Sequence, residues 1–264
     1  MTAKPRPSFP ARLDRTPGPA PARGGAMQPV PASKPTAAKP VIRQQPHGLG
    51  LDSHAVRQAM VNKLAAQGVS DVRVLSAMGT IERHRFVDSA LVNQAYEDTS
   101  LPIGLGQTIS KPGVVSRMAE LLLNGRPDKL GRVLEIGTGC GYQAAVLSLL
   151  ASEVYSIERL RGLHDKAREN LRPLRLPNVH LLFGDGMAGF AKGAPYAAII
   201  AAAGGEAVPQ AWIDQLAMGG RLVAPVASST GGQQALMVID KTPQGLRQTV
   251  LEAVHFVPLK SGIA

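Results

Sequence analysis

The stretch that most constrains this chain is Val133-Leu-Glu-Ile-Gly-Thr-Gly-Cys-Gly141, an apolar run that breaks at three closely spaced glycines. It predicts a buried strand that turns sharply into a helix, because only glycine lets the backbone turn tightly and lie against a flat ligand. A second apolar run, Tyr155-Ser-Ile-Glu158, ends in an acid. An acid at the tip of the next parallel strand can accept both hydroxyls of a ribose, so the pattern predicts a nucleoside cofactor.

The spacing of the glycines indicates which cofactor is expected. The dinucleotide fingerprint G-x-G-x-x-G requires glycine at position 142, where this chain has Tyr142. Glu135, two residues before the first glycine, favours instead a cofactor that carries positive charge, such as the amino group and sulfonium of S-adenosylmethionine. Taken alone, the motif leaves one alternative open, which is a glycine-rich turn that holds no ligand.

Composition separates the first 50 residues from the rest of the chain. They hold 11 of the 21 prolines and eight Lys or Arg against one Asp, so about +7 of the net charge of +10 belongs to them. A proline-rich, acid-poor segment without apolar periodicity cannot bury enough surface to offset its chain entropy. We therefore expect residues 1–50 to be a disordered extension. Residues 51–264 are expected to form the functional domain, with an N-terminal helical subregion on its substrate side.

Charge and hydropathy also argue against some partners. The remaining 214 residues carry only about +3, and aromatic residues make up 4% of the chain, so we expect no nucleic-acid partner. No apolar run has the length of a secretory signal core or of a membrane span. We expect a cytoplasmic monomer that does not bind membranes.

From Arg132 onward, apolar strands and amphipathic helices alternate, which predicts an α/β fold with a doubly wound, mostly parallel seven-stranded sheet. The last two strands have no helix between them and are expected to form an antiparallel hairpin. Strands are expected at 132–136, 153–157, 179–183, 196–201, 220–226, 235–240 and 248–256, with helices from about 141, from 161 and over 209–217. Ligands of such folds bind outside the carboxyl ends of the strands, so one crevice is expected to collect Gly137, Glu158 and Asp185.

The segment before the sheet is expected to be mainly helical. Ser53 is a plausible helix cap, a second helix is expected from Asp71, and residues 81–96 are expected to be helix or loop. A long loop over 96–110 is expected to lead into a helix with Pro112 in its first turn.

Metal and nucleophilic chemistry find little support in the sequence. The six histidines have no metal-ligand spacing, and the single cysteine, Cys140, cannot form a C-x-x-C pair, so we predict no metal site and no catalytic role for this thiol. The chain also lacks the G-x-S-x-G elbow of serine hydrolases.

Several longer segments resemble one known family. They are Leu101-Pro-Ile-Gly-Leu-Gly-Gln-Thr-Ile-Ser-Lys-Pro112, Val133 to Gln143, Gly184-Asp-Gly186, Val208-Pro209, Gln215 to Pro225 and Phe256-Val-Pro-Leu259. The chain resembles the protein-L-isoaspartate O-methyltransferases, which are class I methyltransferases dependent on S-adenosylmethionine. The resemblance covers roughly residues 53–260, and its family-specific part is Gly-Gln-Thr-Ile-Ser-x-Pro.

The resemblance implies a role for each matching residue. Gly137, Thr138, Gly139 and Gly141 would form the cofactor turn, Glu158 would hold the ribose, and Asp185 with Gly186 would flank the adenine. Thr108, Ile109 and Ser110 would lie beside the methyl group, with Ser110 as the catalytic residue on the substrate carboxylate, and Val208 and Pro209 would contact substrate. Isoaspartyl-containing proteins and peptides would be the substrates, methylated to start their repair. From the residues alone, Ser110 could instead be a helix N-cap, and Asp185 a turn or cap residue.

Two positions depart from the family pattern. Tyr196 is followed by Ala197 where the family has Asp, which is expected to remove a carboxylate near the cofactor cleft. His255 replaces an arginine common before the Phe-Val-Pro-Leu run, and Ala201-Ala-Ala-Gly-Gly205 is expected to be a flexible wall of the site. These departures leave an alternative function open, a class I methyltransferase acting on a small molecule or another carboxylate.

Overall fold

The computed structural model describes residues 54–228 and 233–264, so the expected extension over 1–50 and the Ser53 cap lie outside the described residues. Its α-helices are α1 (His54–Ala66), α2 (Val72–Thr80), α3 (Pro112–Leu123), α4 (Tyr142–Leu150), α5 (Arg161–Leu171) and α6 (Gln210–Gln215). Short 3-10 helices are η1 (Arg83–Phe86), η2 (Ser89–Gln94), η3 (Arg172–Leu174), η4 (Gly186–Ala188) and η5 (Ala191–Gly193). The helices expected before the sheet are thus confirmed.

The seven-stranded sheet has the strand order β5-β4-β3-β6-β7-β8-β9. Its strands are β3 (Leu130–Ile136), β4 (Ala151–Glu158), β5 (Val179–Phe183), β6 (Tyr196–Ala201), β7 (Leu216–Ala227), β8 (Gln234–Thr242) and β9 (Gly245–Val254). Strands β3 to β7 pair in parallel, whereas β8 pairs antiparallel with β7 and β9 antiparallel with β8. The predicted fold class is confirmed, and the strand order reverses between β3 and β6, where the crevice was expected.

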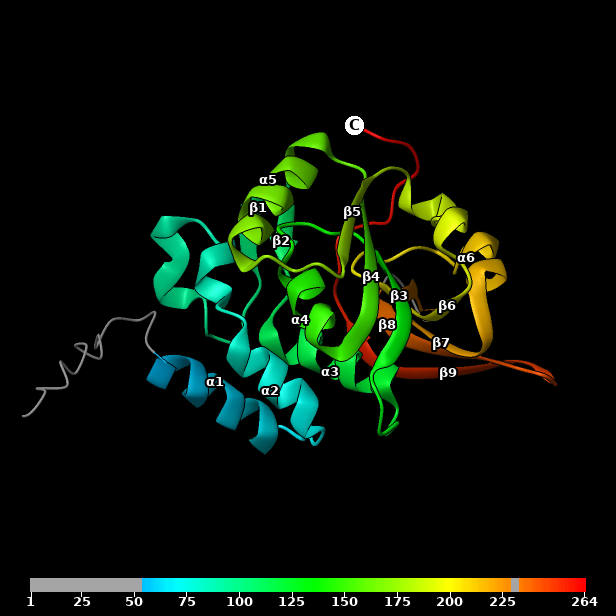
Figure 1. The fold of residues 1–264 in the computed structure, drawn as a ribbon, viewed down its shortest axis with the longest axis horizontal. Coiled ribbons are helices and arrows are strands. Elements are labelled where there is room, and N and C mark those ends of the chain that lie inside the picture. The colour runs from blue at the N-terminus through cyan, green and yellow to red at the C-terminus, as the bar shows by residue number, and fades with distance from the viewer. Residues whose placement is uncertain (1–53, 229–232) are drawn as a thin grey trace, which may run out of the picture. The chain divides into compact units, whose positions relative to one another are not determined.

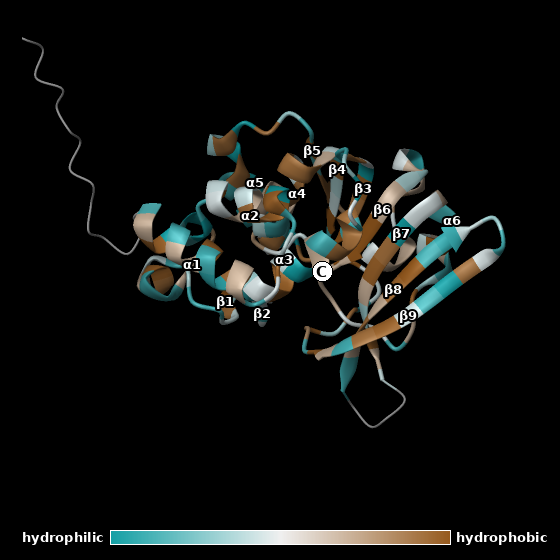
Figure 2. Cartoon of the chain, turned by 90° about the horizontal axis from the view of Figure 1, so that it is seen from below, coloured by the Kyte–Doolittle hydropathy of each residue, from teal (hydrophilic) through white to brown (hydrophobic). Residues whose placement is uncertain are grey.

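Both faces of the sheet are covered, because successive side chains of a strand point to opposite faces. Val133 and Ile200 belong to one buried cluster, with residues of α1 to α5, while Leu134 and Ile199 belong to a second cluster with α6. Figure 1 shows α4 and α6 on opposite sides of the sheet. The edge strand β9 is mostly exposed, and Figure 2 shows hydrophilic stretches along it.

Several element boundaries differ from the sequence-based expectation, β7 for example beginning at Leu216 rather than at 220, and one hairpin was not expected. The expected loop over 96–110 contains an antiparallel hairpin, formed by β1 (Leu101–Gly104) and β2 (Gln107–Ile109). The helix expected over 209–217 ends at residue 215, because Leu216 already pairs with Tyr196 at the start of β7. Packing in the sheet overrides the helical preference of these few residues.

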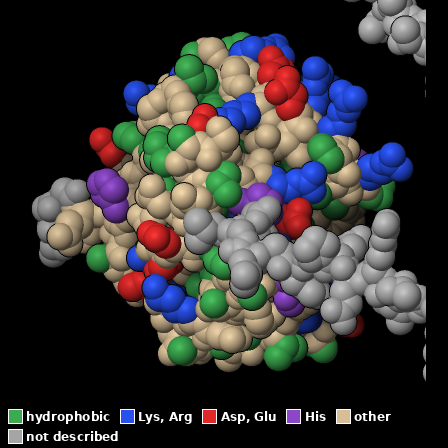
Figure 3. Space-filling model, turned by 90° about the vertical axis from the view of Figure 1, so that its left-hand side faces the viewer, with side chains coloured by type: hydrophobic (Ala, Val, Ile, Leu, Met, Phe, Trp, Pro, Cys, Tyr) green, Lys and Arg blue, Asp and Glu red, His purple; other side chains and the backbone are tan. Residues whose placement is uncertain are grey.

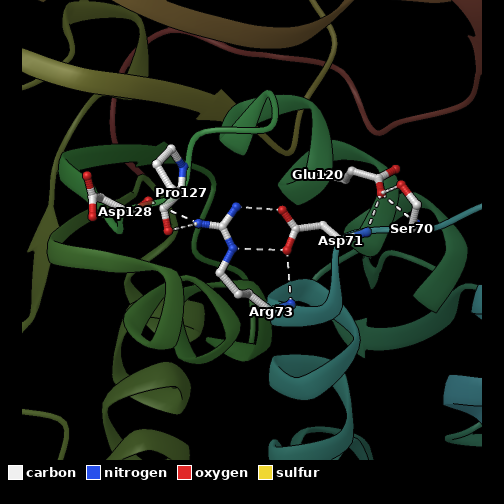
Figure 4. Close-up of polar contacts among 6 residues, drawn as sticks. All are labelled: Ser70, Asp71, Arg73, Glu120, Pro127 and Asp128. Carbon is white, nitrogen blue, oxygen red and sulfur yellow. Dashed lines mark hydrogen bonds and ion pairs between the residues drawn. The ribbon is translucent and has the colours of Figure 1, made fainter.

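A polar cluster fastens the start of α2 to α3 and to the turn before β3 (Figure 4). Asp71 accepts hydrogen bonds from the backbone and the guanidinium of Arg73, whose Nη1 donates to the carbonyls of Pro127 and Asp128 at 2.9 and 3.1 Å. Glu120 Oε1 accepts from the backbone N–H groups of Ser70 and Asp71 at 2.6 and 2.8 Å. These contacts join the N-terminal helices to the layer that covers the sheet.

Basic and acidic side chains are interspersed with hydrophobic ones on the face drawn in Figure 3. In the described part of the chain, none of the helices combines the length and apolarity that crossing a membrane requires.

Candidate active site

The glycine segment folds as a turn between β3 and α4. Gly137, Gly139 and Gly141 have φ angles of +90°, +57° and +91°, a region that side-chain-bearing residues rarely adopt. Gly137 N and Thr138 N donate to the carbonyl of Ile157 at 2.9 and 3.2 Å, which ties the turn to the neighbouring strand β4. The turn therefore presents its backbone to the carboxyl edge of the sheet.

Glu158 ends β4 directly beside this turn and is 5% exposed. Its Oε2 accepts a hydrogen bond from Gly139 N at 2.9 Å, and its Oε1 accepts one from Leu160 N at 2.9 Å. Each carboxylate oxygen retains a further lone pair, so the fixed carboxylate can also accept hydroxyl donors. Glu158 and the turn line the same cavity of about 270 Å³.

Glu135 lies beneath the turn and is fully buried. Its Oε2 accepts from Ser156 Oγ at 2.5 Å, and Ser156 Oγ is 2.6 Å from Thr138 Oγ1, while Glu135 Oε1 has no hydrogen-bond partner within the described residues. Burial raises the pKa of Glu135 to about 8, although the Ser156 hydroxyl acts in the opposite direction. Glu135 does not line the cavity; the hydroxyls of Ser156 and Thr138 link it to the turn.

Asp185 and Gly186 follow β5 at the same edge but differ in placement. Asp185 Oδ1 accepts from Met187 N at 2.8 Å, as the cap of η4, and Oδ2 accepts from Gly262 N at 2.7 Å. Gly186 lines the cavity, and a Cβ there would lie 2.6 Å from Ile136 Cγ2. Gly186 thus permits the close approach of β3. Asp185 does not line the cavity, so the expectation that one crevice collects it together with Gly137 and Glu158 is wrong for Asp185, whose two oxygens accept backbone N–H groups of the protein instead.

The β1–β2 hairpin closes another side of the cavity. Thr108, Ile109 and Ser110 all line it, and Ile109 is 5% exposed within the core. The N-cap of α3 is Lys111, and no capping hydrogen bond comes from a side chain there. The alternative that Ser110 is a helix cap is therefore wrong. Instead Asp98 Oδ1 accepts from Gly113 N at 2.7 Å and serves the first turn of α3.

A larger groove adjoins the cavity. It shares with the cavity Thr108, Ser110, Ala202 and Val257. These shared residues form the junction between the two spaces. A molecule in the cavity and another in the groove would therefore both border these shared residues, Ser110 among them.

Charged side chains of both signs line the groove. Arg117 Nε on α3 lies 3.0 Å from Glu252 Oε1 on β9, and Lys111 Nζ lies 3.9 Å from Asp98 Oδ2. His255, exposed after the end of β9, also lines the groove. Sequence reasoning missed Asp98, Arg117 and Glu252, because their role depends on contacts between distant elements.

Some predicted positions lie away from both spaces. Val208 packs against the second buried cluster and Pro209 caps α6, and neither lines the cavity or the groove. Ala197 lies at the start of β6. A Cβ added to Gly131 would lie 3.2 Å from the Cβ of Ala197, so Ala197 lies beside the start of β3. The expectation that residue 197 lies near the cofactor cleft is wrong, because the cleft is at the carboxyl end of β6.

The 201–205 wall is held by backbone hydrogen bonds to neighbouring segments. Ala202 N donates to Ile136 O at 2.8 Å, Gly204 N donates to Val257 O at 2.9 Å, and Leu259 N donates back to Gly204 O at 2.8 Å. The C-terminal residues 257–260 thereby line the cavity as well. The wall is fixed on both sides, which differs from the flexibility expected from its glycines.

The single cysteine, Cys140, is buried in the glycine turn. Burial raises the pKa of Cys140 to about 11, which keeps the thiol protonated at neutral pH. Within 54–228 and 233–264, no group of three His, Cys, Asp or Glu side chains is arranged to hold a metal ion.

Comparison with known proteins agrees with this geometry. The model of the family "Protein-L-isoaspartate(D-aspartate) O-methyltransferase (PCMT)" matches residues 55–264. The protein-L-isoaspartate O-methyltransferase of Methylibium petroleiphilum is 58% identical over 264 residues, covering 98% of this chain and 97% of the relative. The corresponding protein of Ralstonia nicotianae is 53% identical over 262 residues, covering 93% and 82%.

Solved structures of similar fold carry related names. A protein-L-isoaspartate O-methyltransferase superposes with a TM-score of 0.71 at 30% identity, covering 78% of this chain and 67% of that one. A Plasmodium falciparum beta-aspartate methyltransferase in complex with S-adenosyl-L-homocysteine has a TM-score of 0.66 at 22% identity, covering 77% and 98%, which supports the fold. The resemblance carried by the Gly-Gln-Thr-Ile-Ser segment and the glycine turn is confirmed: this chain belongs to the protein-L-isoaspartate O-methyltransferase family.

Proposed function

We propose that this enzyme transfers the methyl group of S-adenosylmethionine to the α-carboxylate of L-isoaspartyl residues in damaged proteins, the first step of their repair. The observation that carries the proposal is the position of Ser110, which lines both the cavity of about 270 Å³ and the larger groove. The donor would occupy the cavity and the peptide the groove. Family membership supports both assignments.

The residues of the cavity fit S-adenosylmethionine. The turn at Gly137 and Gly139 offers backbone without side chains, and the fixed Glu158 carboxylate offers free lone pairs to ribose hydroxyls. Glu158 lies in the cavity wall, while Glu135 beneath the turn, whose pKa burial raises to about 8, holds a proton at neutral pH and adds no negative charge. When bound, S-adenosylmethionine supplies an electrophilic methyl group on a positively charged sulfonium.

The groove has the composition to hold a peptide. Lys111, Arg117 and His255 offer donors to carbonyls and carboxylates, while Asp98 and Glu252 offer acceptors to backbone N–H groups. Apolar residues such as Phe256 lie between them. This mixed lining, larger in volume than the cavity, favours an extended peptide over a small metabolite.

For methyl transfer to a carboxylate, the main task of the protein is to orient the two reacting groups. An isoaspartyl α-carboxylate has a pKa of about 3.3–3.7, so it is anionic at neutral pH and needs no general base. Ser110 would donate its hydroxyl to this carboxylate and aim its other oxygen at the junction, with Thr108 and Ile109 as the adjoining wall. Holding the two reacting groups about 3–3.5 Å apart is the main source of rate acceleration. The backbone nitrogen of the following residue then attacks the carbonyl of the methyl ester and expels methanol, which forms a succinimide whose hydrolysis returns some normal aspartate.

Sequence composition supports one of the wider assignments, which is that nucleic acid is not a partner. We propose that the enzyme acts as a cytoplasmic monomer, and that its partners are isoaspartyl-containing proteins. Its near-neutral domain offers little attraction to nucleic acid. Light scattering of the purified protein tests the oligomeric state.

Methyl transfer from labelled S-adenosylmethionine tests the proposed function. Two peptides of identical sequence are compared, one with L-isoaspartate and one with normal aspartate at the same position. We expect labelled, base-labile ester on the isoaspartyl peptide alone. Equal labelling of both peptides, or labelling of small carboxylic acids in preference to either, would contradict the proposal.

A further inference from the structure

Leu105 occupies a strained position at the tip of the β1–β2 hairpin. Its φ angle is +52°, and it lies between Gly104 at +99° and Gly106 at +69°. A left-handed backbone costs a residue with a side chain about 1–2 kcal/mol, whereas glycine adopts it readily. A third glycine would satisfy this turn with less strain, so the leucine side chain calls for an explanation beyond the turn.

The side chain of Leu105 is also unusually exposed for its position. Leu105 is 62% exposed, yet it lines the cavity together with Glu158 and Leu160. Its Cδ1 lies at the start of α5, where a Cβ added to Gly162 would be only 3.1 Å away. It does not line the groove. The leucine therefore reaches from the hairpin toward α5 across the cofactor side of the site.

The base of the β1–β2 hairpin contacts α5 and the glycine turn. Lys166 Nζ on α5 donates to the carbonyl of Ile103 at 2.8 Å, and a Cβ added to Gly139 would lie 3.2 Å from Ile103 Cδ1. Ile103 itself is 4% exposed. The hairpin is thus fixed at its base against α5 and the glycine turn, while its tip carries an apolar side chain with little protein around it.

We propose that Leu105 is a positioning residue that covers the bound nucleoside cofactor and slows its release. This inference rests on the proposed location of the cofactor beside Glu158. An exposed leucine at a cavity mouth loses its contact with water when a ligand fills the cavity, and the gain in apolar burial offsets the backbone strain. We expect Leu105 to affect the binding of the cofactor and not that of the peptide, because Leu105 does not line the groove.

The test is the affinity and dissociation rate of S-adenosylhomocysteine, measured by calorimetry and by stopped-flow displacement. Leu105→Ala removes three side-chain carbon atoms. If about half of their surface contacts the bound ligand, both the Kd and the dissociation rate of S-adenosylhomocysteine should rise about tenfold. The KM for isoaspartyl peptide at saturating S-adenosylmethionine should stay unchanged. Leu105→Met, which keeps the length and apolarity of the side chain, should restore retention of the ligand.

Two further variants separate this role from a structural one. Leu105→Gly relieves the left-handed strain, so the ligand-free enzyme should melt at no lower temperature than the wild type while release of S-adenosylhomocysteine accelerates. Met218→Ala, which alters a side chain 63% exposed on β7 and outside both spaces, serves as the matched control and should leave release unchanged.

The outcomes distinguish this inference from the proposed cofactor site. If Glu158→Ala weakens S-adenosylhomocysteine binding while Leu105→Ala releases it at the wild-type rate, the role of Leu105 is overturned and the site stands. If Glu158→Ala also leaves affinity unchanged, the location of the cofactor is wrong. A rise in peptide KM without faster release of the cofactor would equally overturn the assignment of Leu105.

Discussion

Glu158 Oε2 accepts a hydrogen bond from Gly139 N at 2.9 Å, so the acid that ends β4 is fixed to the glycine turn that follows β3. The second oxygen is fixed by Leu160 N at the same distance. Two neighbouring strands thereby place a preorganised carboxylate in the cavity wall before any ligand binds. Preorganisation of this kind reduces the entropy cost of binding.

Glu158→Ala should weaken the binding of S-adenosylhomocysteine by tenfold to a few hundredfold. Hydrogen bonds to a charged group are worth about 1.5–3 kcal/mol each, and up to two ribose hydroxyls would lose their acceptor. Titration calorimetry measures the change. Glu169→Gln, at an exposed position of α5, is the control and should bind as the wild type does.

Glu135→Gln should change how stability depends on pH. The pKa of Glu135 is about 8 in the folded protein, against 4.5 for an unperturbed glutamate, so between these values the folded state keeps a proton that the unfolded state has lost. Stability from this group is therefore greatest at low pH and falls as pH rises from about 4.5 to 8, by an amount on the order of a few kcal/mol.

Melting temperatures of wild type and Glu135→Gln between pH 5 and 8 check this expectation. The difference between the two proteins should grow in favour of the glutamine variant as pH rises. Parallel melting curves across the range would show that Glu135 does not titrate in this window. Glu169→Gln again serves as the control, because its side chain is exposed.

Glu120→Ala should lower the free energy of unfolding by about 1–2 kcal/mol, because the N–H groups of Ser70 and Asp71 lose their acceptor. None of the residues labelled in Figure 4 lines the cavity, so affinity for S-adenosylhomocysteine should not change. Urea unfolding measures the loss, and Glu120→Gln, which keeps an acceptor oxygen, should recover part of it. A Glu120→Ala variant that loses affinity for S-adenosylhomocysteine but keeps its free energy of unfolding would contradict this prediction.

Removal of residues 1–50 should leave catalysis and melting temperature unchanged. Their sequence offers no periodic apolar face for a core, and the family model begins at residue 55. A chain starting near Leu51 is compared with the full chain by calorimetry and by methylation of an isoaspartyl peptide. A clearly lower melting temperature in the shorter chain would assign the segment to the domain.

The sequence predicted the sheet well because its strands are continuous apolar runs. Residues 196–201 were predicted with the observed bounds of β6, since both faces of that strand are buried. The β1–β2 hairpin was missed because each strand has only three or four residues. The alternation of buried Leu101 and Ile103 with exposed Pro102 and Gly104 was the signal that could have revealed it.

The site was only partly predictable for a related reason. Gly137, Gly139 and Glu158 lie on adjacent strand ends, where local sequence fixes position, and they line one cavity. The partners of Asp185 and the distance of Ala197 from the cleft depend on where other strands begin and where the C-terminal segment runs. Long-range packing of this kind leaves no local pattern in the chain.

The central claim is that donor and acceptor meet beside the Ser110 hydroxyl, and the most direct test is kcat/KM of Ser110→Ala for an isoaspartyl peptide. We expect a decrease of about ten- to a hundredfold, the equivalent of one hydrogen bond to a charged group. Because Ser110 does not cap α3, whose first turn is served by Asp98, the melting temperature should stay unchanged, as should affinity for S-adenosylhomocysteine. Wild-type kcat/KM in a stably folded Ser110→Ala enzyme would contradict the account.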